Sequence, residues 1–216
     1  PRSTLDRSSA ASDVYKRQTS NLELEASKIV RENASTRKIR GLGMSTSLYD
    51  LTIGSYTQIL ASAVGYLEKG KSHFQETGID LQDVVETKLY ENMADFHFQV
   101  VSLNHHSTKT IAALSSGEFN PPIGYEPRDY DGLLQMTKDS LAELNSKSAE
   151  EINALAEGNI TFKMGSTEWP FTSRNFVLSF SLPNFYFHAT TAYDILRMKG
   201  VKIGKMDFLG SMKIGS

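Results

Sequence analysis

The sequence predicts an all-α fold, a four-helix bundle with a small β-hairpin inserted before the last helix. Four long segments space their apolar residues three or four apart, which is the period of an amphipathic helix. The connections between these segments are long enough to cross a bundle. One short stretch alternates apolar and polar residues instead, which is typical of a strand.

The first predicted helix follows Ser45 or Ser47, since either hydroxyl can cap a helix N-terminus. Its apolar positions share one face and are Leu48, Tyr56, Ile59, Leu60, Ala63 and Leu67. We expect this helix to end near Gly70 or to continue raggedly to His73. The GID turn at 78–80 then predicts a short helix capped by Asp80.

The second predicted helix covers residues 86–115. Its stripe consists of Leu89, Met93, Phe96, Val100, Leu103, Ser107, Ile111 and Leu114. Residues 115–127 are rich in Gly and Pro and therefore predict a loop. A third helix is expected to begin at Asp129 or Asp131 and to end near Ser146, with one further turn over residues 150–155.

The predicted hairpin lies in NITFKMGSTEWPFT, residues 159–172. Apolar residues alternate before and after Gly165-Ser166, which suits a tight turn. The fourth long helix should be capped by Thr172 or Ser173. Pro183 must kink this helix or begin a new one, because it lacks an N–H and clashes one turn back.

From residue 184 the last helix should run to about Lys199, with Gly200 as its stop signal. The segment after it is Gly-rich but still contains apolar residues. We expect these residues to pack back on the helices; they are Val201, Ile203, Met206, Phe208 and Leu209.

Composition excludes several classes of protein. The chain has 216 residues, 39% of them hydrophobic, which suits one domain and a packed core. Apolar runs are short and broken by charges, so we expect no membrane span and a cytoplasmic protein. With a net charge of −2 and no Lys/Arg-rich run, we expect no nucleic-acid partner. Cysteine is absent, which excludes disulfides and thiolate metal sites and leaves His, Asp and Glu as possible ligands.

The first 43 residues differ from the rest, with nine Lys/Arg against five Asp/Glu. Residues 1–18 look like a translated sequencing-adapter read-through, so we interpret 1–43 as a non-native or disordered extension. A genuine disordered extension and a transit peptide are the alternatives, although acidic residues argue against the latter. Residues 44–210 form the predicted domain, with Met44 as its preferred start, and residues 211–216 form a tail.

Five histidines are the residues with the most chemical potential. His73 and His97 are expected at the surface. His105 and His106 are neighbours on a helix and point about 100° apart, so only one can face the bundle centre. His106 shares a face with Gln99, Leu103 and Thr110, and we therefore predict that His106 points inward.

His188 lies in LPNFYFHATTAY, residues 182–193, on the face of Phe185, Ala192 and Ile195. It could be a hydrogen-bonded core histidine, a metal ligand, or a base that contacts substrate. A helical metal pair usually needs ligands at i and i+4, but the residue at i+4 is Ala192. Asp95, Glu91 or Asp194 could supply a carboxylate, and spacing favours none of them.

Other catalytic motifs are missing. No serine lies in a Gly-x-Ser-x-Gly turn, so nucleophilic hydrolysis has no support. GVKIGK at 200–205 lacks the spacing of a phosphate-binding loop. The residues by themselves therefore indicate a kind of domain rather than a reaction.

Three blocks resemble the uncharacterised DUF1993 family of the DinB/YfiT-like superfamily: MSTSLYDLT at 44–52, LPNFYFHATTAYDILR at 182–197 and GVKIGKMDFLG at 200–210. The resemblance spans about residues 44–210 and implies a four-helix bundle. Many superfamily members bind a divalent metal through one histidine of the second helix and an i, i+4 pair of the fourth. Some are metal- and thiol-cofactor-dependent transferases or isomerases.

Carried onto this chain, the resemblance makes His106 and His188 the metal residues, with Ala192 where the third ligand should be. It therefore implies a degenerate metal site in a non-catalytic protein that binds a small molecule or a partner, with no cofactor. The alternative is a metal-dependent transferase or hydrolase that uses His106 and His188 with nickel or zinc. Pairing through helix faces is frequent in such proteins, so the resemblance also implies a possible homodimer.

Overall fold

The structure of the protein is a computed structural model that describes residues 46–214. The predictions for residues 1–43 and for Ser45 as a cap therefore lie outside the described residues. From Thr46 to Glu91 and from Asp95 onward, the described chain belongs to one unit. The fold of this unit is mostly helical with one small sheet, which confirms the predicted predominance of helix.

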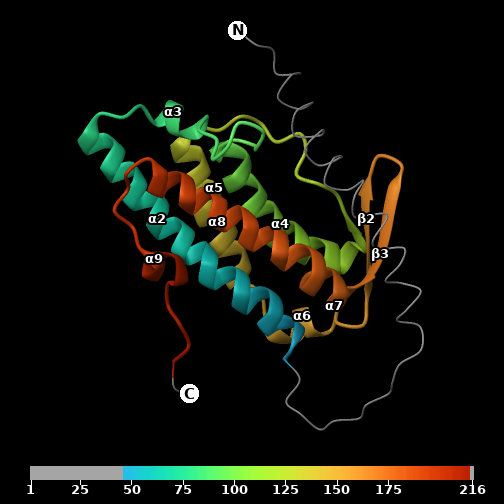
Figure 1. The fold of residues 1–216 in the computed structure, drawn as a ribbon. Helices are drawn as coiled ribbons and strands as arrows, with labels where there is room; N and C mark the ends of the chain where they lie inside the picture. Colours follow the sequence, from blue (N-terminus) through green and yellow to red (C-terminus); the bar gives the residue numbers. More distant parts are fainter. Residues whose placement is uncertain (1–45, 215–216) are drawn as a thin grey trace. The chain divides into compact units, whose positions relative to one another are not determined.

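Four long helices make up most of the unit and lie side by side (Figure 1). They are α2 (Ser55–Thr77), α4 (Phe96–Ser116), α5 (Tyr130–Asn145) and α8 (Leu182–Met198). Helices α2 and α4 each pack against both α5 and α8. Most residues of the apolar stripes that predicted these helices are buried, and among the described residues no helix is long and apolar enough to cross a membrane.

Helix α2 is longer than predicted. It follows a π-helical turn, η2 (Asp50–Gly54), and ends at Gly78, whose φ of 69° is left-handed. The predicted end at Gly70 is wrong because this glycine serves packing. A Cβ atom there would lie 2.5 Å from the Tyr130 hydroxyl and 3.3 Å from Leu196, so the missing side chain lets α5 and α8 approach.

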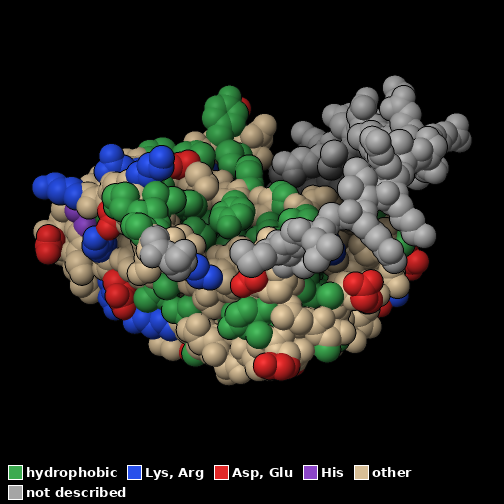
Figure 2. Space-filling model, turned by 90° about the horizontal axis from the view of Figure 1, so that it is seen from below, with side chains coloured by type: hydrophobic (Ala, Val, Ile, Leu, Met, Phe, Trp, Pro, Cys, Tyr) green, Lys and Arg blue, Asp and Glu red, His purple; other side chains and the backbone are tan. Residues whose placement is uncertain are grey.

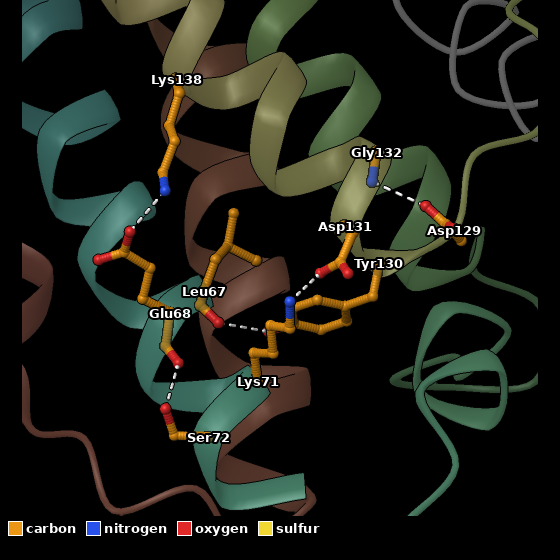
Figure 3. A network of polar contacts seen from close by, with 9 residues as sticks. All are labelled: Leu67, Glu68, Lys71, Ser72, Asp129, Tyr130, Asp131, Gly132 and Lys138. Carbon is orange, nitrogen blue, oxygen red and sulfur yellow. Dashed lines mark hydrogen bonds and ion pairs between the residues drawn. The ribbon is translucent and has the colours of Figure 1, made fainter. Parts of the chain in front are cut away.

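The interface of α2 with α5 is built around Tyr130, at the start of α5 (Figure 3). Its hydroxyl donates to the carbonyl of Leu67 at 2.8 Å. The Tyr130 ring stacks on Phe96 and meets Phe74 edge-on. Two exposed ion pairs lie along the edge of this interface, Lys71–Asp131 and Lys138–Glu68, each at 2.7 Å.

Helix α4 begins ten residues later than predicted. The Asp95 carboxylate accepts from Phe98 N at 3.0 Å and so caps the helix at that point. The backbone N–H of Phe96 donates to Thr87 O, which holds the preceding segment in a non-helical path. Before this segment, Asp80 caps the short helix α3 (Leu81–Val85), as predicted. Helix α4 ends at Gly117, with φ of 76°.

The sheet has three strands in the order β1-β2-β3: β1 (Glu118–Phe119), β2 (Asn159–Met164) and β3 (Thr167–Thr172). Strands β2 and β3 are antiparallel and meet at Gly165-Ser166. Strand β1 pairs in parallel with β2, which places Phe119 beside Phe162. The sequence predicted a loop at β1, because two residues are too few to show a period.

The last helical stretch begins at Thr172, whose hydroxyl caps α7 (Ser173–Phe176). A π-helical turn, η3 (Val177–Ser181), follows, and α8 begins directly before Pro183. Since the backbone changes from π to α helix there, the proline sits in the first turn of α8, where its missing N–H costs little. Gly200, with φ of 93°, follows the helix as predicted.

The short connecting helices complete the fold. Asp129 caps α5, as predicted, and α6 (Ala149–Asn153) follows α5. After α8, Val201 and Ile203 are buried and α9 (Lys205–Leu209) packs against α2. Met206 is 60% exposed, so the prediction that it packs back on the helices is wrong. Figure 2 shows a face on which hydrophobic side chains reach the surface among charged ones of both signs.

Candidate functional site

Two histidines meet in the interface of α4 with α8. The rings of His106 and His188 have centroids 5.7 Å apart and planes inclined by 15°. His106 is fully buried and His188 is 5% exposed. The prediction that His106 points inward agrees with this burial, and the fold brings both candidate residues together.

His188 is held in one tautomer by Gln99. Its Nδ1 lies 2.8 Å from Gln99 Oε1, and an amide oxygen can only accept a hydrogen bond. Nδ1 therefore carries the proton and Nε2 keeps its lone pair. Burial lowers the pKa of His188 to about 3, with a smaller contribution from His105, so the ring is neutral at pH 7.

Gln99 is a site residue that sequence reasoning did not assign. The available signal was its place on the His106 face of α4, seven residues earlier, which is two helical turns. Nothing in the sequence indicates that an imidazole of α8 would reach this amide.

His106 is in an unusual environment. Both ring nitrogens are buried, and neither has a hydrogen-bond partner among the described residues. Burial, followed by the neighbouring His188 and His105, holds the pKa of His106 well below its ordinary value. A neutral imidazole has one donor and one acceptor, and leaving each unpaired in a core costs about 1–3 kcal/mol.

Aromatic rings enclose the pair. Phe119 of β1 stacks on His106 at 5.4 Å, and Phe180 of η3 lies 5.9 Å from it. Phe98 and Phe187 meet His188 edge-on. This surrounding is apolar, so hydrogen bonds formed inside it are stronger than in water.

His105 is buried as well, although it lies under the loop after α4 and away from the His106–His188 contact. It points about 100° away from His106, as the helix requires, and the loop after α4 covers it. Its Nε2 donates to Asn120 O at 2.7 Å, and its Nδ1 accepts from the Tyr125 hydroxyl at 2.9 Å. Burial lowers the pKa of His105 to about 4.

The backbone of His106 is fixed by a cluster of hydroxyl groups. Ser181, the last residue of η3, donates to His106 O at 2.8 Å. Its Oγ also lies 2.6 Å from Thr110 Oγ1 and 2.7 Å from the Tyr56 hydroxyl. Burial raises the pKa of Tyr56, so these groups stay neutral. The π-helical turn brings Ser181 to this position, and such turns are frequent at functional sites.

The residues present do not fit a three-histidine metal site. Ala192, where the third ligand is expected, is fully buried and has no donor atom. Both ring nitrogens of His105 are engaged, and the Asp95 carboxylate caps α4. Within residues 46–214, no group of three or more His, Asp or Glu side chains is arranged to hold a metal ion.

The comparisons with known proteins agree with this fold. The chain is similar to a solved structure of a DinB family member protein from Shewanella denitrificans, with 24% identity and a TM-score of 0.63. The match covers 78% of this chain and 95% of that one, and at this identity it shows the fold alone. No curated protein matches. Residues 48–209 match the family described as Domain of unknown function (DUF1993), and the chain belongs to this family.

Proposed function

We propose that the four long helices form a DinB/YfiT-like bundle that binds a small neutral molecule at the ring nitrogens of His106 and His188, without a metal and without catalysis. The observation that carries this proposal is the His106 ring, which is fully buried and has no hydrogen-bond partner for either nitrogen within residues 46–214. Buried polar groups in folded proteins almost always have partners. A ligand that pairs with these nitrogens would recover the free energy that their burial costs.

The chemistry of the site selects the ligand class. Both imidazoles are neutral at pH 7 and aromatic rings surround them, so a charged ligand would lose its hydration without gaining a counter-ion. His188 Nε2 can accept a hydrogen bond from a ligand, and the neutral His106 ring can accept one and donate one. A small molecule with a hydroxyl or amide group matches this set.

The electrostatics favour binding over acid–base catalysis. A general base works best when its pKa is near the operating pH. With a pKa of about 3, His188 would take up a proton poorly at pH 7. The hydroxyl groups of Ser181 and Thr110 are engaged with His106 O and with each other.

The second candidate is a metal-dependent transferase or hydrolase that uses His106 and His188 with nickel or zinc. One observation favours it. His188 donates Nδ1–H to Gln99, and histidines that bind metals usually donate their other ring N–H in this way. This candidate needs at least one further ligand, which Ala192 does not provide.

The experiment compares the full chain with the His106→Leu and His188→Leu variants, each purified without a histidine tag or chelator. Native mass spectrometry measures bound small molecules, and elemental analysis measures metal. We expect a small organic adduct on the wild type that both variants lose, and metal far below one atom per chain. His73→Leu on α2 is the matched control and should keep the adduct.

The outcomes separate the candidates. About one nickel or zinc per chain, lost in His188→Leu, would contradict the first proposal and support the second. Neither adduct nor metal, with only the unfolding free energy changed in the variants, would contradict both and leave a structural role. The same native mass spectra test the predicted homodimer.

A further inference from the structure

His105, the neighbour of His106 on α4, is covered by a segment without helix or strand. Among the rings around His106, Phe119 comes from the two-residue strand β1, and residues 120–129 follow it to the start of α5. Most of this segment is exposed, and Ile123 is 58% exposed. Three of its residues are prolines, which lack an N–H and so cannot donate a backbone hydrogen bond that would attach the segment to the helices.

The segment is attached to α4 through histidine rings. His105 donates to Asn120 O and accepts from the Tyr125 hydroxyl. Further along, Arg128 N donates to His97 Nε2 at 3.1 Å. These bonds hold the segment over His105, whose ring lies 5.7 Å from the ring of His106. The residue that fastens the segment therefore lies directly beside the candidate binding residue.

We infer that residues 120–129 form a lid, fastened by His105 and Tyr125, whose opening gives a small molecule access to His106; this inference rests on the proposed binding function. Apart from His105, the rings that contact His106 are those of Phe119, Phe180 and His188, which belong to the sheet and to the packed helical stretch η3–α8. Its backbone is held by Ser181 and Thr110. Lifting the lid disturbs a few hydrogen bonds, whereas separating α4 from α8 would open the core.

The test uses Tyr125→Phe, which removes only the hydroxyl that donates to His105. Hydrogen exchange measures the opening of residues 120–126, and brief treatment with diethyl pyrocarbonate, mapped by mass spectrometry, measures access to each histidine. Losing one hydrogen bond should increase both rates about three- to tenfold, for the lid and for His106 alike. Tyr90→Phe, at a 62% exposed tyrosine, is the matched control and should change neither.

Amides in the middle of α4, such as that of Val100, should exchange at the wild-type rate, because the lid opens without the helices. Faster exchange of the lid with an unchanged rate of His106 modification would overturn the inference. An unchanged exchange rate of the lid would overturn it too. If His106 responds as expected but no adduct exists on the purified protein, the proposed function fails while the lid stands. If an adduct exists but the rate of His106 modification does not change in Tyr125→Phe, the lid inference fails while the proposed function stands.

Discussion

Two interfaces of the molecule treat buried polar groups in opposite ways. Where α2 meets α5, the buried Tyr130 hydroxyl donates to Leu67 O, and its ring is packed by Phe74 and Phe96. Where α4 meets α8, no described residue pairs with either nitrogen of the buried His106 ring. Both interfaces join long helices of one fold, so general packing rules do not explain the difference.

The difference between the two interfaces shows which of them is less stable than its packing would allow. Folded proteins follow the rule of pairing buried polar groups almost everywhere, and the exceptions concentrate at functional sites. The α2–α5 interface follows the rule and needs no explanation beyond folding. The α4–α8 interface breaks it at His106, next to a second histidine that Gln99 holds in a defined tautomer. The contrast supports a binding role for the second interface.

The largest expected effect is a loss of stability in acid that comes from the α4–α8 side. Burial lowers the pKa of His105 to about 4, that of His188 to about 3, and that of His106 well below its ordinary value. The unfolded chain therefore binds more protons below pH 6.5, and stability falls as the pH drops towards these folded values. We expect about 2 kcal/mol lost for each of His105 and His188 between pH 7 and pH 5, and a further loss in the same direction from His106.

Urea unfolding at pH 7, 6 and 5 measures this effect. His106→Leu removes one of the three groups and should therefore reduce the pH dependence. An unfolding free energy that does not change between pH 7 and pH 5 would show that these rings are hydrated or already protonated in the folded protein.

On the α2–α5 side, the largest expected effect comes from Tyr130→Ala. The substitution removes a fully packed ring and its hydrogen bond to Leu67 O, and it leaves a cavity beside Gly70. Large-to-small changes at buried aromatic residues cost about 3–5 kcal/mol. Thermal or urea unfolding measures the loss, with the exposed Tyr90→Ala as control. A cost below about 1 kcal/mol would mean that Tyr130 is not central to this interface.

Removing polar groups alone should give opposite signs in the two interfaces. Tyr130→Phe loses a satisfied bond and should destabilise the protein by about 0.5–1.5 kcal/mol. His106→Leu removes two unpaired nitrogens at similar volume and should stabilise the ligand-free protein by about 1–3 kcal/mol. Urea unfolding at pH 8, where the histidines do not titrate, measures both. If His106→Leu destabilises ligand-free protein, the His106 nitrogens have partners in solution and the contrast disappears.

The sequence predicted local features well and contacts between distant elements poorly. Asp80, Asp129 and Thr172 cap helices as expected, because a cap depends on residues only a few positions away. The start of α4 was misplaced, since Leu89 and Met93 continue the helical spacing although Asp95 caps the helix.

The candidate site shows the same limit. The helical period predicted that His106 points inward. The hydrogen bond between Gln99 and His188, however, joins α4 to α8, and no local sequence pattern indicates such a contact. The role of His105 depends on a loop that folds back over the helix and could not be inferred from spacing. Sequence reasoning therefore identified both histidines of the pair and missed the residues that orient and cover them.

The smallest expected effect comes from the exposed ion pairs at the edge of the α2–α5 interface. Glu68 and Lys138 form an ion pair at 2.7 Å, but their side chains are 51% and 42% exposed (Figure 3). Exposed pairs are screened by water and salt and lose side-chain entropy when they form. A double-mutant cycle with Glu68→Gln and Lys138→Met should give a coupling of about 0.2–1 kcal/mol that decreases in 1 M salt. A coupling above about 2 kcal/mol would mean that the charged edge of this interface, rather than the rings around Tyr130, is the main source of its stability. The expected small value means instead that the α2–α5 side is stable because its core polar group is paired, which is the property that His106 lacks.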